Sequence, residues 1–257
     1  MKKIIPIKKL GQNYLKDKNI IEKIVREIDP GKDDQIIEIG PGLGALTAGL
    51  AEKSKYLTLI EIDRRVIEEL KSRFSDANII EGDFLKINIE SILERRRTVK
   101  VVGNIPYNVT SPILFKLISL REKINESVLM VQDEVARRLT ASYRTKDYGI
   151  LSVILSYFGD VKYRFRISPN VFHPKPKVHS AVIHIYFNNK RDNELDEELF
   201  IKIVKASFGH RRKTLKNSLS NGIFKDYDFS AIDFDFSKRA EELKVSDYVY
   251  LTKMMQP

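Results

Sequence analysis

Apolar runs alternate with amphipathic helical patterns along the first 187 residues of the 257-residue chain. Short apolar runs bounded by glycine, proline or acidic residues predict buried strands, and apolar residues three or four positions apart predict helices. One helical stripe runs from Ile20 to Ile28 after Asp17, a predicted N-cap. Asp63 is predicted to cap a second helix, and Pro112 lies in the first turn of a third. Strands are predicted at 35–37, 56–63, 78–82, 99–102 and 127–131, and further helices at 134–140 and 149–158.

The pattern changes in the later part of the chain. Residues 162–167 and 178–187 alternate apolar with polar side chains around a proline-rich connection, which predicts an antiparallel pair of strands. Strand–helix–strand repeats with such a pair at one edge predict an α/β fold, with a doubly wound and mostly parallel sheet. The polar stretch 188–194 is interpreted as a linker, followed by short helices at 195–208, 211–219, 237–243 and 246–255. We therefore expect a sheet domain at 1–187 and a small all-α domain at 188–257.

A glycine-rich turn follows the first strand of the predicted sheet. The segment from Glu38 to Gly44 reads Glu-Ile-Gly-Pro-Gly-Leu-Gly, and a glycine lets a ligand lie against the backbone because no Cβ intervenes. A glycine cluster alone is more often an ordinary tight turn. This spacing, however, differs from the patterns of dinucleotide folds and P-loops, and Pro41 removes an N–H that a phosphate would need. The turn therefore favours a ligand with ribose but no phosphate, such as S-adenosylmethionine.

Acidic residues end the next two predicted strands. Glu61 lies about twenty residues after the first glycine of the turn, where nucleotide-binding folds hold ribose hydroxyls. Asp83 follows the strand at 78–82, where an acceptor can reach an adenine amino group. Each residue alone is more often a helix cap or a solvated strand end. Because parallel strands end at one edge of a sheet, the two carboxylates and the glycine turn together predict a ligand crevice.

The strand at 99–102 leads into a second candidate loop, Asn104-Ile105-Pro106-Tyr107. Its amide, rigid kink and aromatic ring suit the methylation of a planar amino group. Asn104 in isolation is more often a loop-forming residue. We expect the side-chain oxygen of Asn104 and the backbone carbonyl of Ile105 or Pro106 to accept hydrogen bonds from the amino group, which localises its lone pair. Pro106 fixes φ and so presents these acceptors in advance.

The charge balance indicates the kind of partner. The chain carries 45 Lys and Arg against 35 Asp and Glu, a formal net charge of +10. Nucleic acid is the simplest partner for such a protein, although a Lys-rich protein with a solvated surface has the same balance. Basic residues lie next to aromatic residues at 143–148 and 162–166. Because a groove that grips phosphates and stacks bases combines these residue types, the distribution favours nucleic acid.

Other features exclude several classes of site. The absence of Cys excludes disulfides, thiolate zinc sites and a cysteine nucleophile. His173 and His179 have no third ligand near them in the sequence, so no metal site is predicted, and both are interpreted as surface or RNA-contacting residues. No apolar run is long enough to span a bilayer. We expect a cytoplasmic protein that does not contact a membrane.

Motifs along nearly the whole chain resemble those of the ribosomal RNA adenine dimethyltransferases, which make N6,N6-dimethyladenosine in small-subunit rRNA. Residues 11–15, Gly-Gln-Asn-Tyr-Leu, are similar to the cofactor-covering motif of that family. Residues 38–44 and 104–107 resemble its glycine motif and its catalytic loop. Residues 172–180 resemble its late Phe-x-Pro-x-Pro-x-Val-x-Ser motif, and residues 208–215 resemble the basic helix that opens its C-terminal domain.

The resemblance implies a seven-stranded Rossmann-like methyltransferase sheet and S-adenosylmethionine as the methyl donor. It implies methylation of two adjacent adenosines near the 3′ end of 16S rRNA, in late ribosome assembly, by a monomer bound to small-subunit rRNA within an assembling 30S particle. The implied cofactor contacts are Asn13, Leu15, Gly40, Gly42, Glu61, Ile62, Asp83, Phe84 and Asn104. The implied catalytic residues are Asn104, Ile105, Pro106, Tyr107 and Phe172. The implied RNA contacts are Lys175, Lys177, Arg211, Arg212, Lys213 and Lys216.

Two aromatic residues of this set have a specific implied role. Tyr107 and Phe172 would sandwich the target base after it leaves its stack. Phe172 lies near Pro174 and Pro176, and an ordinary core aromatic residue fits the same pattern. Only the resemblance favours the role in base binding.

One departure keeps related functions in view. The dimethyltransferases usually carry Leu where this chain has Ile105, and Ile is common there in the large-subunit adenine methyltransferases that confer macrolide resistance. The motif at 12–15 and the basic residues at 211–213 favour the small-subunit type. The alternatives are the large-subunit enzyme, a non-catalytic RNA-binding assembly factor, and a methyltransferase acting on protein glutamine or DNA adenine.

Overall fold

The computed structural model describes residues 5–7, 10–94, 97–187 and 192–256. The chain divides into two compact units: residues 1–136 with 161–187, and residues 137–160 with 188–257. Residues 188–191, the first part of the predicted linker, lie outside the described residues. The second unit thus contains residues 137–160, which the predicted boundary at residue 187 assigns to the sheet domain.

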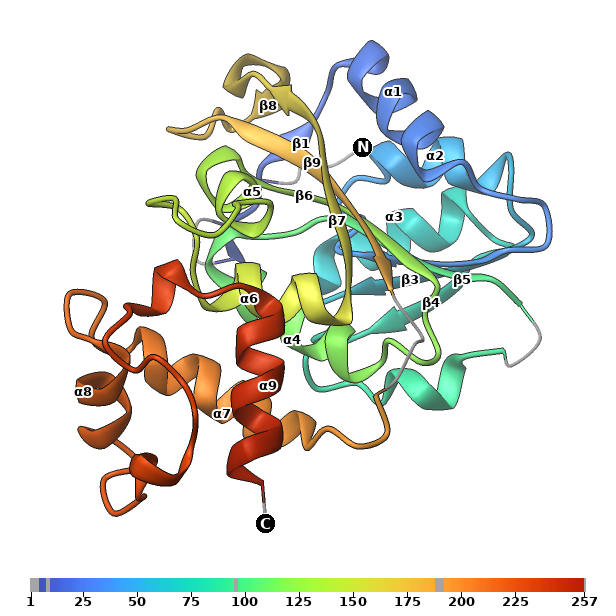
Figure 1. The fold of residues 1–257 in the computed structure, drawn as a ribbon. Coiled ribbons are helices and arrows are strands. Elements are labelled where there is room, and N and C mark those ends of the chain that lie inside the picture. Colours follow the sequence, from blue (N-terminus) through green and yellow to red (C-terminus); the bar gives the residue numbers. More distant parts are fainter. Residues whose placement is uncertain (1–4, 8–9, 95–96, 188–191, 257) are drawn as a thin grey trace. The chain divides into compact units, whose positions relative to one another are not determined.

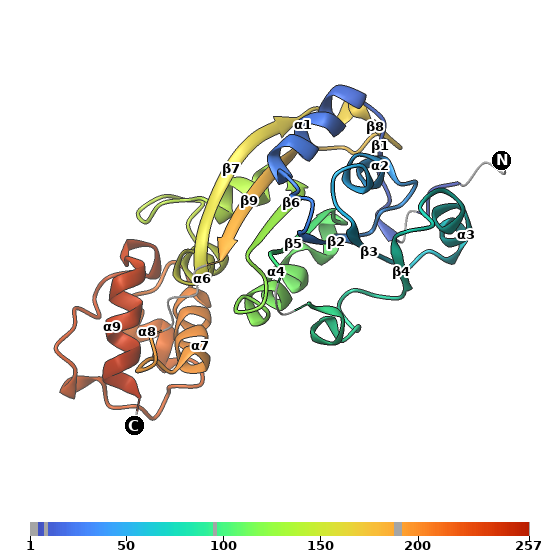
Figure 2. The same ribbon diagram turned by 90° about the vertical axis from the view of Figure 1, so that its right-hand side faces the viewer.

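The first unit is built on a seven-stranded sheet in the order β4-β3-β2-β5-β6-β9-β7 (Figure 1). The strands from β4 to β6 in this order pair in parallel, and β9 pairs antiparallel to β6. The predicted α/β class and the antiparallel pair at one edge are confirmed, with β7 and β9 running in opposite directions (Figure 2). The strands are β2 (Gln35–Ile39), β3 (Tyr56–Glu61), β4 (Asn78–Glu81), β5 (Val99–Asn104), β6 (Glu126–Gln132), β7 (Gly159–Ile167) and β9 (Ser180–Phe187).

Helices cover both faces of this sheet, with α1 and α2 on one face and α4 on the other (Figure 2). The predicted caps are present. The Asp17 side chain accepts a hydrogen bond from Ile20 N at 3.0 Å, and that of Asp63 accepts one from Arg65 N at 3.1 Å. Pro112 lies in the first turn of α4. The α-helices of this unit are α1 (Lys18–Ile28), α2 (Ala45–Ala51), α3 (Arg64–Arg73) and α4 (Thr110–Ser119), and α5 (Asp133–Leu139) crosses the boundary into the second unit.

A second, two-stranded sheet joins distant parts of the chain. Strand β1 (Tyr14–Leu15) pairs antiparallel with β8 (Phe172–His173), so that Tyr14 faces His173 and Leu15 faces Phe172. Lys16 N extends the pairing by donating to the Val171 carbonyl at 2.9 Å. The N-terminal motif and the late proline-rich motif therefore form one local structure.

The second unit is helical. It contains α6 (Ile150–Phe158), α7 (Glu197–Phe208), α8 (Leu215–Ser220) and α9 (Val245–Met255). Helix α6 belongs to this unit because its apolar face packs on α7. The ring centroids of Tyr157 and Phe200 lie 4.6 Å apart. Tyr248 is buried and donates its hydroxyl to the Ala240 carbonyl at 2.9 Å.

Two helices predicted in this unit are shorter than expected. The helix predicted at 211–219 begins only at Leu215, because residues 209–212 form a turn and Thr214 caps the helix by accepting from Asn217 N. The helix predicted at 237–243 is a single 3-10 turn, Ala240–Glu242. Arg212 therefore lies in the turn before α8, while Lys216 lies in its first turn.

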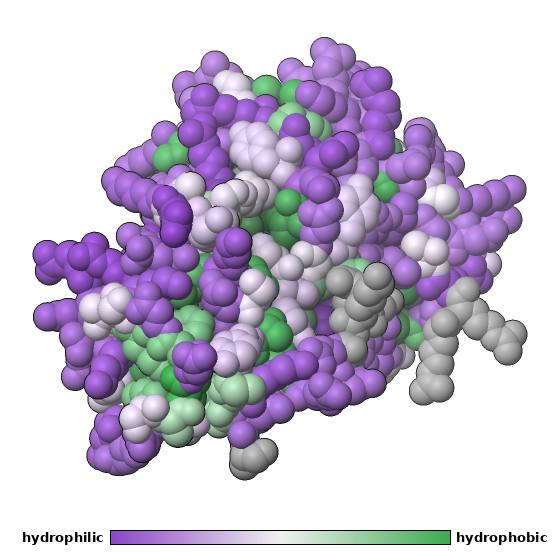
Figure 3. Space-filling model, viewed as in Figure 1, coloured by the Kyte–Doolittle hydropathy of each residue, from purple (hydrophilic) through white to green (hydrophobic). Residues whose placement is uncertain are grey.

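The surface is mostly hydrophilic, and apolar residues gather over the second unit (Figure 3). Exposed apolar side chains of that unit include Ile223, Tyr250 and Met254. Within the described part of the chain, no helix combines the length and apolar character needed to cross a membrane.

Candidate active site

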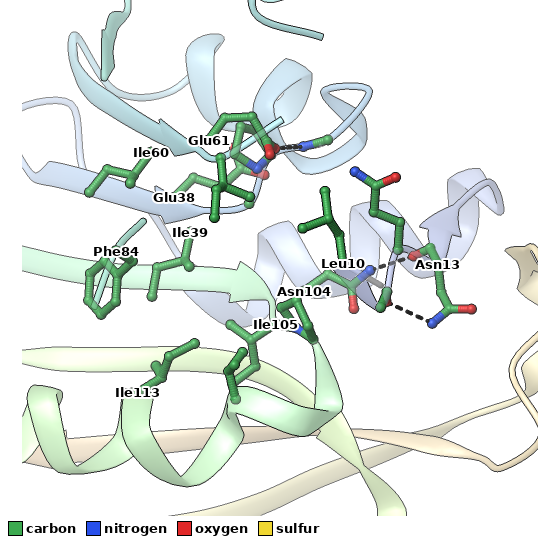
Figure 4. A pocket seen from close by; sticks show the side chains of 18 of the residues that line it. Leu10, Asn13, Glu38, Ile39, Ile60, Glu61, Phe84, Asn104, Ile105 and Ile113 are labelled. Atoms are coloured by element: carbon green, nitrogen blue, oxygen red, sulfur yellow. Dashed lines mark hydrogen bonds between the residues drawn. The ribbon is translucent and has the colours of Figure 1, made fainter. Parts of the chain in front are cut away.

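A cavity of about 220 Å³ lies at the carboxyl ends of β2, β3 and β5 (Figure 4). The parallel register aligns Ile39 with Ile60 on one side and with Gly103 on the other, so these strands end together. The chain runs from β2 outwards through β3 and β4 and then returns to β5, and crevices at such reversals of strand order bind ligands. All of the predicted cofactor contacts line this cavity, and so do the predicted catalytic residues except Phe172.

The glycine turn gives the cavity an open backbone wall. Gly40 has φ of +64° and Gly42 has φ of +54°, a region that side chains rarely adopt. A Cβ built on Gly40 meets no atom within 4 Å, so a ligand can approach the backbone there. A Cβ on Gly42 would lie 2.8 Å from the ring of Tyr14, so the glycine also lets the N-terminal segment pack on the turn.

Glu61 is buried, and its carboxylate is held in place by backbone groups. One oxygen accepts from Gly42 N at 3.0 Å and the other from Asp63 N at 2.8 Å. Burial raises the pKa of Glu61, and the hydrogen bonds from Asp63 and Gly42 oppose that rise. The carboxylate is thus fixed at the cavity wall, and a carboxylate has further lone pairs for ligand hydroxyls.

Glu38 is a cavity residue that the sequence reasoning did not place in the site. It is 2% exposed and accepts a hydrogen bond from the Thr47 hydroxyl at 2.7 Å. Burial raises the pKa of Glu38 to about 7, with the Thr47 hydrogen bond opposing the shift. An acidic residue inside the apolar strand 35–39, directly before the glycine turn, is the sequence signal that points to it.

Asp83, Phe84 and Ile62 form another part of the wall. The Asp83 side chain accepts from Leu85 N at 2.9 Å, Phe84 is buried, and Ile62 is half exposed. Lys116 of α4 fixes the loop that carries Asp83 and Phe84, because its ammonium group donates to the carbonyls of Phe84 and Ile87. Burial lowers the pKa of Lys116. A planar apolar ligand with a donor at its edge fits this wall.

Asn104 lies at the end of β5 with its amide oriented by the N-terminal segment (Figure 4). Its amide nitrogen donates to the backbone carbonyl of Asn13 at 2.8 Å. A carbonyl oxygen can only accept, so the NH₂ group must face Asn13 and the amide oxygen must face away from it. The orientation that the predicted role of Asn104 requires is therefore set by its neighbour.

The rest of the loop at 104–107 is held by burial and hydrogen bonds. Ile105 is 1% exposed, and the Pro106 carbonyl accepts from Val109 N at 3.1 Å. The Tyr107 hydroxyl lies 2.7 Å from the Ser180 hydroxyl, which ties the ring to the final residue of the late motif. Burial raises the pKa of Tyr107.

Phe172 does not line the cavity. Its side chain is 5% exposed and packs in the hydrophobic core together with Leu15, its partner in the β1–β8 pair. The structure places it as a core aromatic residue, the alternative interpretation of the sequence. The sandwich of Tyr107 and Phe172 around an open space is not present.

The predicted RNA contacts differ in whether their charged groups already bind other protein groups. Lys175 and Lys177 are exposed in the first unit, and Arg212, Lys213 and Lys216 are exposed in the second. Arg211 is bound within the second unit. Its guanidinium donates to the carbonyls of Lys146 and Tyr148, at 2.8 and 3.0 Å, and lies 3.3 Å from the Glu241 carboxylate.

The side chains around the cavity restrict its ligand. Glu38, Glu61 and Asp83 line it, and none of the described residues that line it is Lys or Arg. A wall that carries three carboxyl groups and no Lys or Arg disfavours a phosphate and favours hydroxyl groups or positive charge. S-adenosylmethionine has a ribose, an adenine and a sulfonium and lacks phosphate, so its chemistry fits this wall. No cluster of three or more metal-ligating side chains occurs among the residues that the structure describes.

Comparisons with known proteins agree with this geometry. A family model for ribosomal RNA adenine dimethylase matches residues 7–256. The ribosomal RNA small subunit methyltransferase A of Chlorobium phaeobacteroides strain BS1 is 44% identical over 251 residues, which cover 97% of this chain and 94% of that protein. The protein of the same name from Francisella tularensis subsp. novicida is 42% identical, covering 96% of this chain and 97% of that protein.

Solved structures are similar as well. A dimethyladenosine transferase from Plasmodium falciparum has a TM-score of 0.77 at 26% identity, covering 92% of this chain and 95% of that one. A 23S rRNA methyltransferase has a TM-score of 0.69 at 24% identity, covering 95% and 100%, a likeness that shows the fold alone. The chain belongs to the ribosomal RNA adenine dimethylase family and is an rRNA adenine dimethyltransferase that uses S-adenosylmethionine.

Proposed function

We propose that this enzyme methylates the exocyclic amino groups of two adjacent adenosines near the 3′ end of 16S rRNA, giving dimethyladenosine in a late 30S assembly particle. The observation that carries this proposal is the fixed amide of Asn104, whose oxygen faces away from Asn13 at the wall of an acidic cavity. The names of the relatives that are 42–44% identical support the small subunit as the source of the substrate.

In the proposed cofactor site, Glu61 accepts hydrogen bonds from the ribose hydroxyls and Asp83 accepts one from the adenine amino group. Ile62 and Phe84 contact the two faces of the adenine. Glu38 faces the ammonium group of the methionine moiety. The backbone at Asn13, Leu15, Gly40 and Gly42, together with Asn104, completes the contacts.

The reaction requires a better nucleophile than a free adenine amine. Bound S-adenosylmethionine supplies an electrophilic methyl group on its sulfonium. The amine is weakly nucleophilic because its lone pair is delocalised into the ring. The Asn104 oxygen and the Ile105 carbonyl accept hydrogen bonds from the two N–H groups of the amine. These hydrogen bonds favour a pyramidal nitrogen with a localised lone pair. Of the two predicted carbonyls, that of Ile105 is the better candidate because the Pro106 carbonyl already accepts from Val109 N. After methyl transfer the nitrogen releases its proton to water.

The target base leaves its stack and lies on Tyr107, whose ring is held through Ser180. We keep Phe172 as the proposed second aromatic contact. Its side chain is buried, so it can contact the base only if the β8 segment moves and exposes it. Tyr107 requires no such movement, because it already lines the cavity.

For the RNA itself, we propose contacts from Lys175 and Lys177 of the sheet unit and from Arg212, Lys213 and Lys216 of the helical unit. Residues 188–257 then act as a small RNA-binding domain. The exposed ammonium and guanidinium groups suit phosphate oxygens. We propose that the enzyme acts in the cytoplasm, as a monomer bound to the assembling 30S particle.

The large-subunit alternative rested on Ile105. This side chain lines the cavity but is only 1% exposed, so a change between Leu and Ile mainly alters packing. The residue therefore gives little reason to prefer a large-subunit substrate, and the names of the more similar relatives favour the small subunit.

A methylation assay tests the proposal directly. The purified enzyme and labelled S-adenosylmethionine are incubated with 30S particles whose adenosines are unmethylated, with 50S particles, and with protein-free 23S rRNA. We expect label in 16S rRNA alone, and mass mapping should locate dimethyladenosine at two adjacent positions near its 3′ end. Label in 23S rRNA, or none in 16S rRNA, would contradict the proposed substrate.

A further inference from the structure

Gln12 and Ile5 are hydrogen-bonded to Asp63 and Arg65, two residues that follow β3 in the chain. Asp63 is 4% exposed, and its side chain accepts hydrogen bonds from Gln12 Nε2 at 2.8 Å and from the guanidinium of Arg65 at 2.6 and 2.8 Å. The oxygen of the Gln12 amide accepts from Ile7 N at 2.8 Å. Arg65 also donates to the Ile5 carbonyl at 3.0 Å. We call this set of contacts the N-terminal latch.

The latch touches the two functional ends of the cavity. On the cofactor side, the backbone N–H of Asp63 donates to Glu61, the proposed ribose-binding carboxylate. On the acceptor side, Gln12 is followed by Asn13, whose carbonyl orients the amide of Asn104. Among the described residues, Gln12 bonds Ile7 and Asp63 while Asn104 bonds Asn13, so we expect any effect of Gln12 on methyl transfer to pass through the position of Asn13.

The geometry points to Gln12 as a positioning residue for the catalytic amide. By holding the segment to Asp63, Gln12 fixes the Asn13 carbonyl and thereby keeps the Asn104 oxygen directed at the target amine. This inference rests on the proposed role of Asn104. The orientation of the Asn104 amide then depends on a segment that lies 91 residues earlier in the chain.

The Asp63 end of the latch is stable over the useful pH range. The hydrogen bonds from Arg65 lower the pKa of Asp63 to about 2, against the opposing effect of burial. The carboxylate therefore stays ionised and accepts from Gln12 at every pH at which the enzyme is assayed. The groups around it are Arg65, Glu61 and Tyr14, all in the same unit.

A double-mutant cycle separates positioning from a general structural effect. The variants are Gln12→Leu, Asn104→Ala and the double variant, compared by single-turnover methyl transfer at saturating cofactor. We expect Gln12→Leu to slow transfer by about tenfold, since a hydrogen bond to a charged group is lost. In the Asn104→Ala background we expect no further loss, because the amide that Gln12 orients is already gone.

A matched control is available in the second unit. Gln256 uses its amide in the same way, donating to the Glu194 carbonyl at 2.7 Å and accepting from Asp196 N at 3.1 Å. Gln256→Leu should leave the transfer rate unchanged. A Gln12→Leu rate equal to wild type, or an equal loss in both Asn104 backgrounds, would overturn the assignment. Gln12→Ala serves as a second variant if leucine does not fit the space.

An independent readout does not depend on activity. In NMR spectra, the side-chain amide protons of Asn104 and the backbone amide of Ile7 should be protected from exchange in the wild type and in Gln256→Leu. Both should lose protection in Gln12→Leu. Protection of the Asn104 amide that survives in Gln12→Leu would contradict the coupling, whatever substrate the enzyme uses. Failure of the proposed function is distinguished by the wild-type enzyme, which would then methylate no rRNA.

Discussion

The amide nitrogen of Asn104 lies 2.8 Å from the backbone carbonyl oxygen of Asn13, and this contact directs the amide oxygen away from Asn13. The two residues come from the end of β5 and from the segment that lines the cofactor cavity. The proposed acceptor for the amine is therefore oriented by a segment that itself lines the cavity.

Replacing Asn104 tests its role in the reaction. Asn104→Ala removes an acceptor whose contribution appears mainly in the transition state. We expect cofactor affinity, measured by calorimetry, to change little, and single-turnover methyl transfer to fall on the order of a hundred- to a thousandfold. Near-normal turnover in a folded variant would rule out this role.

Glu61 should contribute mainly to cofactor affinity. Glu61→Ala removes charge-assisted hydrogen bonds to the ribose, and we expect binding to weaken by about 1.5–3 kcal/mol. Because Glu61 also accepts from Gly42 N and Asp63 N, part of the effect can come from the turn itself. Glu61→Gln keeps a side chain of the same shape with one accepting oxygen and serves as the comparison. Unchanged affinity in both folded variants would remove Glu61 from the ribose site.

Glu38 should make the ligand-free enzyme less stable at higher pH. Its pKa is raised from 4.5 to about 7 by burial, so the folded state binds a proton that the unfolded state has lost. Between these values stability falls as pH rises, and above pH 7 the full penalty is present, on the order of 1–3 kcal/mol. Below 4.5 both states are protonated and the penalty is absent.

The measurement for Glu38 is thermal melting of Glu38→Gln against wild type across this pH range. The variant should melt higher at pH 8, and the difference should close as the pH falls toward 5. Its cofactor affinity should be weaker, since the ammonium group loses a carboxylate. Equal melting temperatures at pH 8 would show that burial does not penalise the ionised form.

The salt dependence of RNA binding tests the basic residues of the second unit. Arg212→Ala with Lys213→Ala should weaken binding to 30S particles and flatten the log–log salt slope, by roughly one unit or slightly less per lost phosphate contact. Arg211 is left intact because it holds Lys146 and Tyr148 within the unit. Lys225→Ala with Lys238→Ala removes two exposed charges of the same unit as a control. An unchanged slope in the first pair would take these residues out of the RNA site.

Patterns repeated along the chain account for what could be predicted. Apolar runs and N-cap aspartates such as Asp17 gave the strands and helices because burial and capping act locally. The positions of Glu61 and Asp83 followed from the rule that parallel strands end at one edge of the sheet. The cavity that contains both is consistent with that rule.

Contacts between distant segments could not be read in the same way. The pair of two-residue strands that joins Leu15 to Phe172 is too short to show a period, so the sequence could not decide between a core position and base binding for Phe172. The orientation of Asn104 depends on a backbone carbonyl, which every residue has. Arg211 and Arg212 are the same residue type, and only the fold shows that the first binds carbonyls of its own unit.

Mass analysis of the 3′ end of 16S rRNA from a strain that lacks the enzyme is the most direct test of the role of Asn104. Adding back the wild-type chain should restore dimethyladenosine at two adjacent positions, and adding back a folded, equally abundant Asn104→Ala variant should not. Two unmodified adenosines with the wild type, or full dimethylation with Asn104→Ala, would contradict the central claim that the oriented amide of Asn104 directs methylation of small-subunit rRNA.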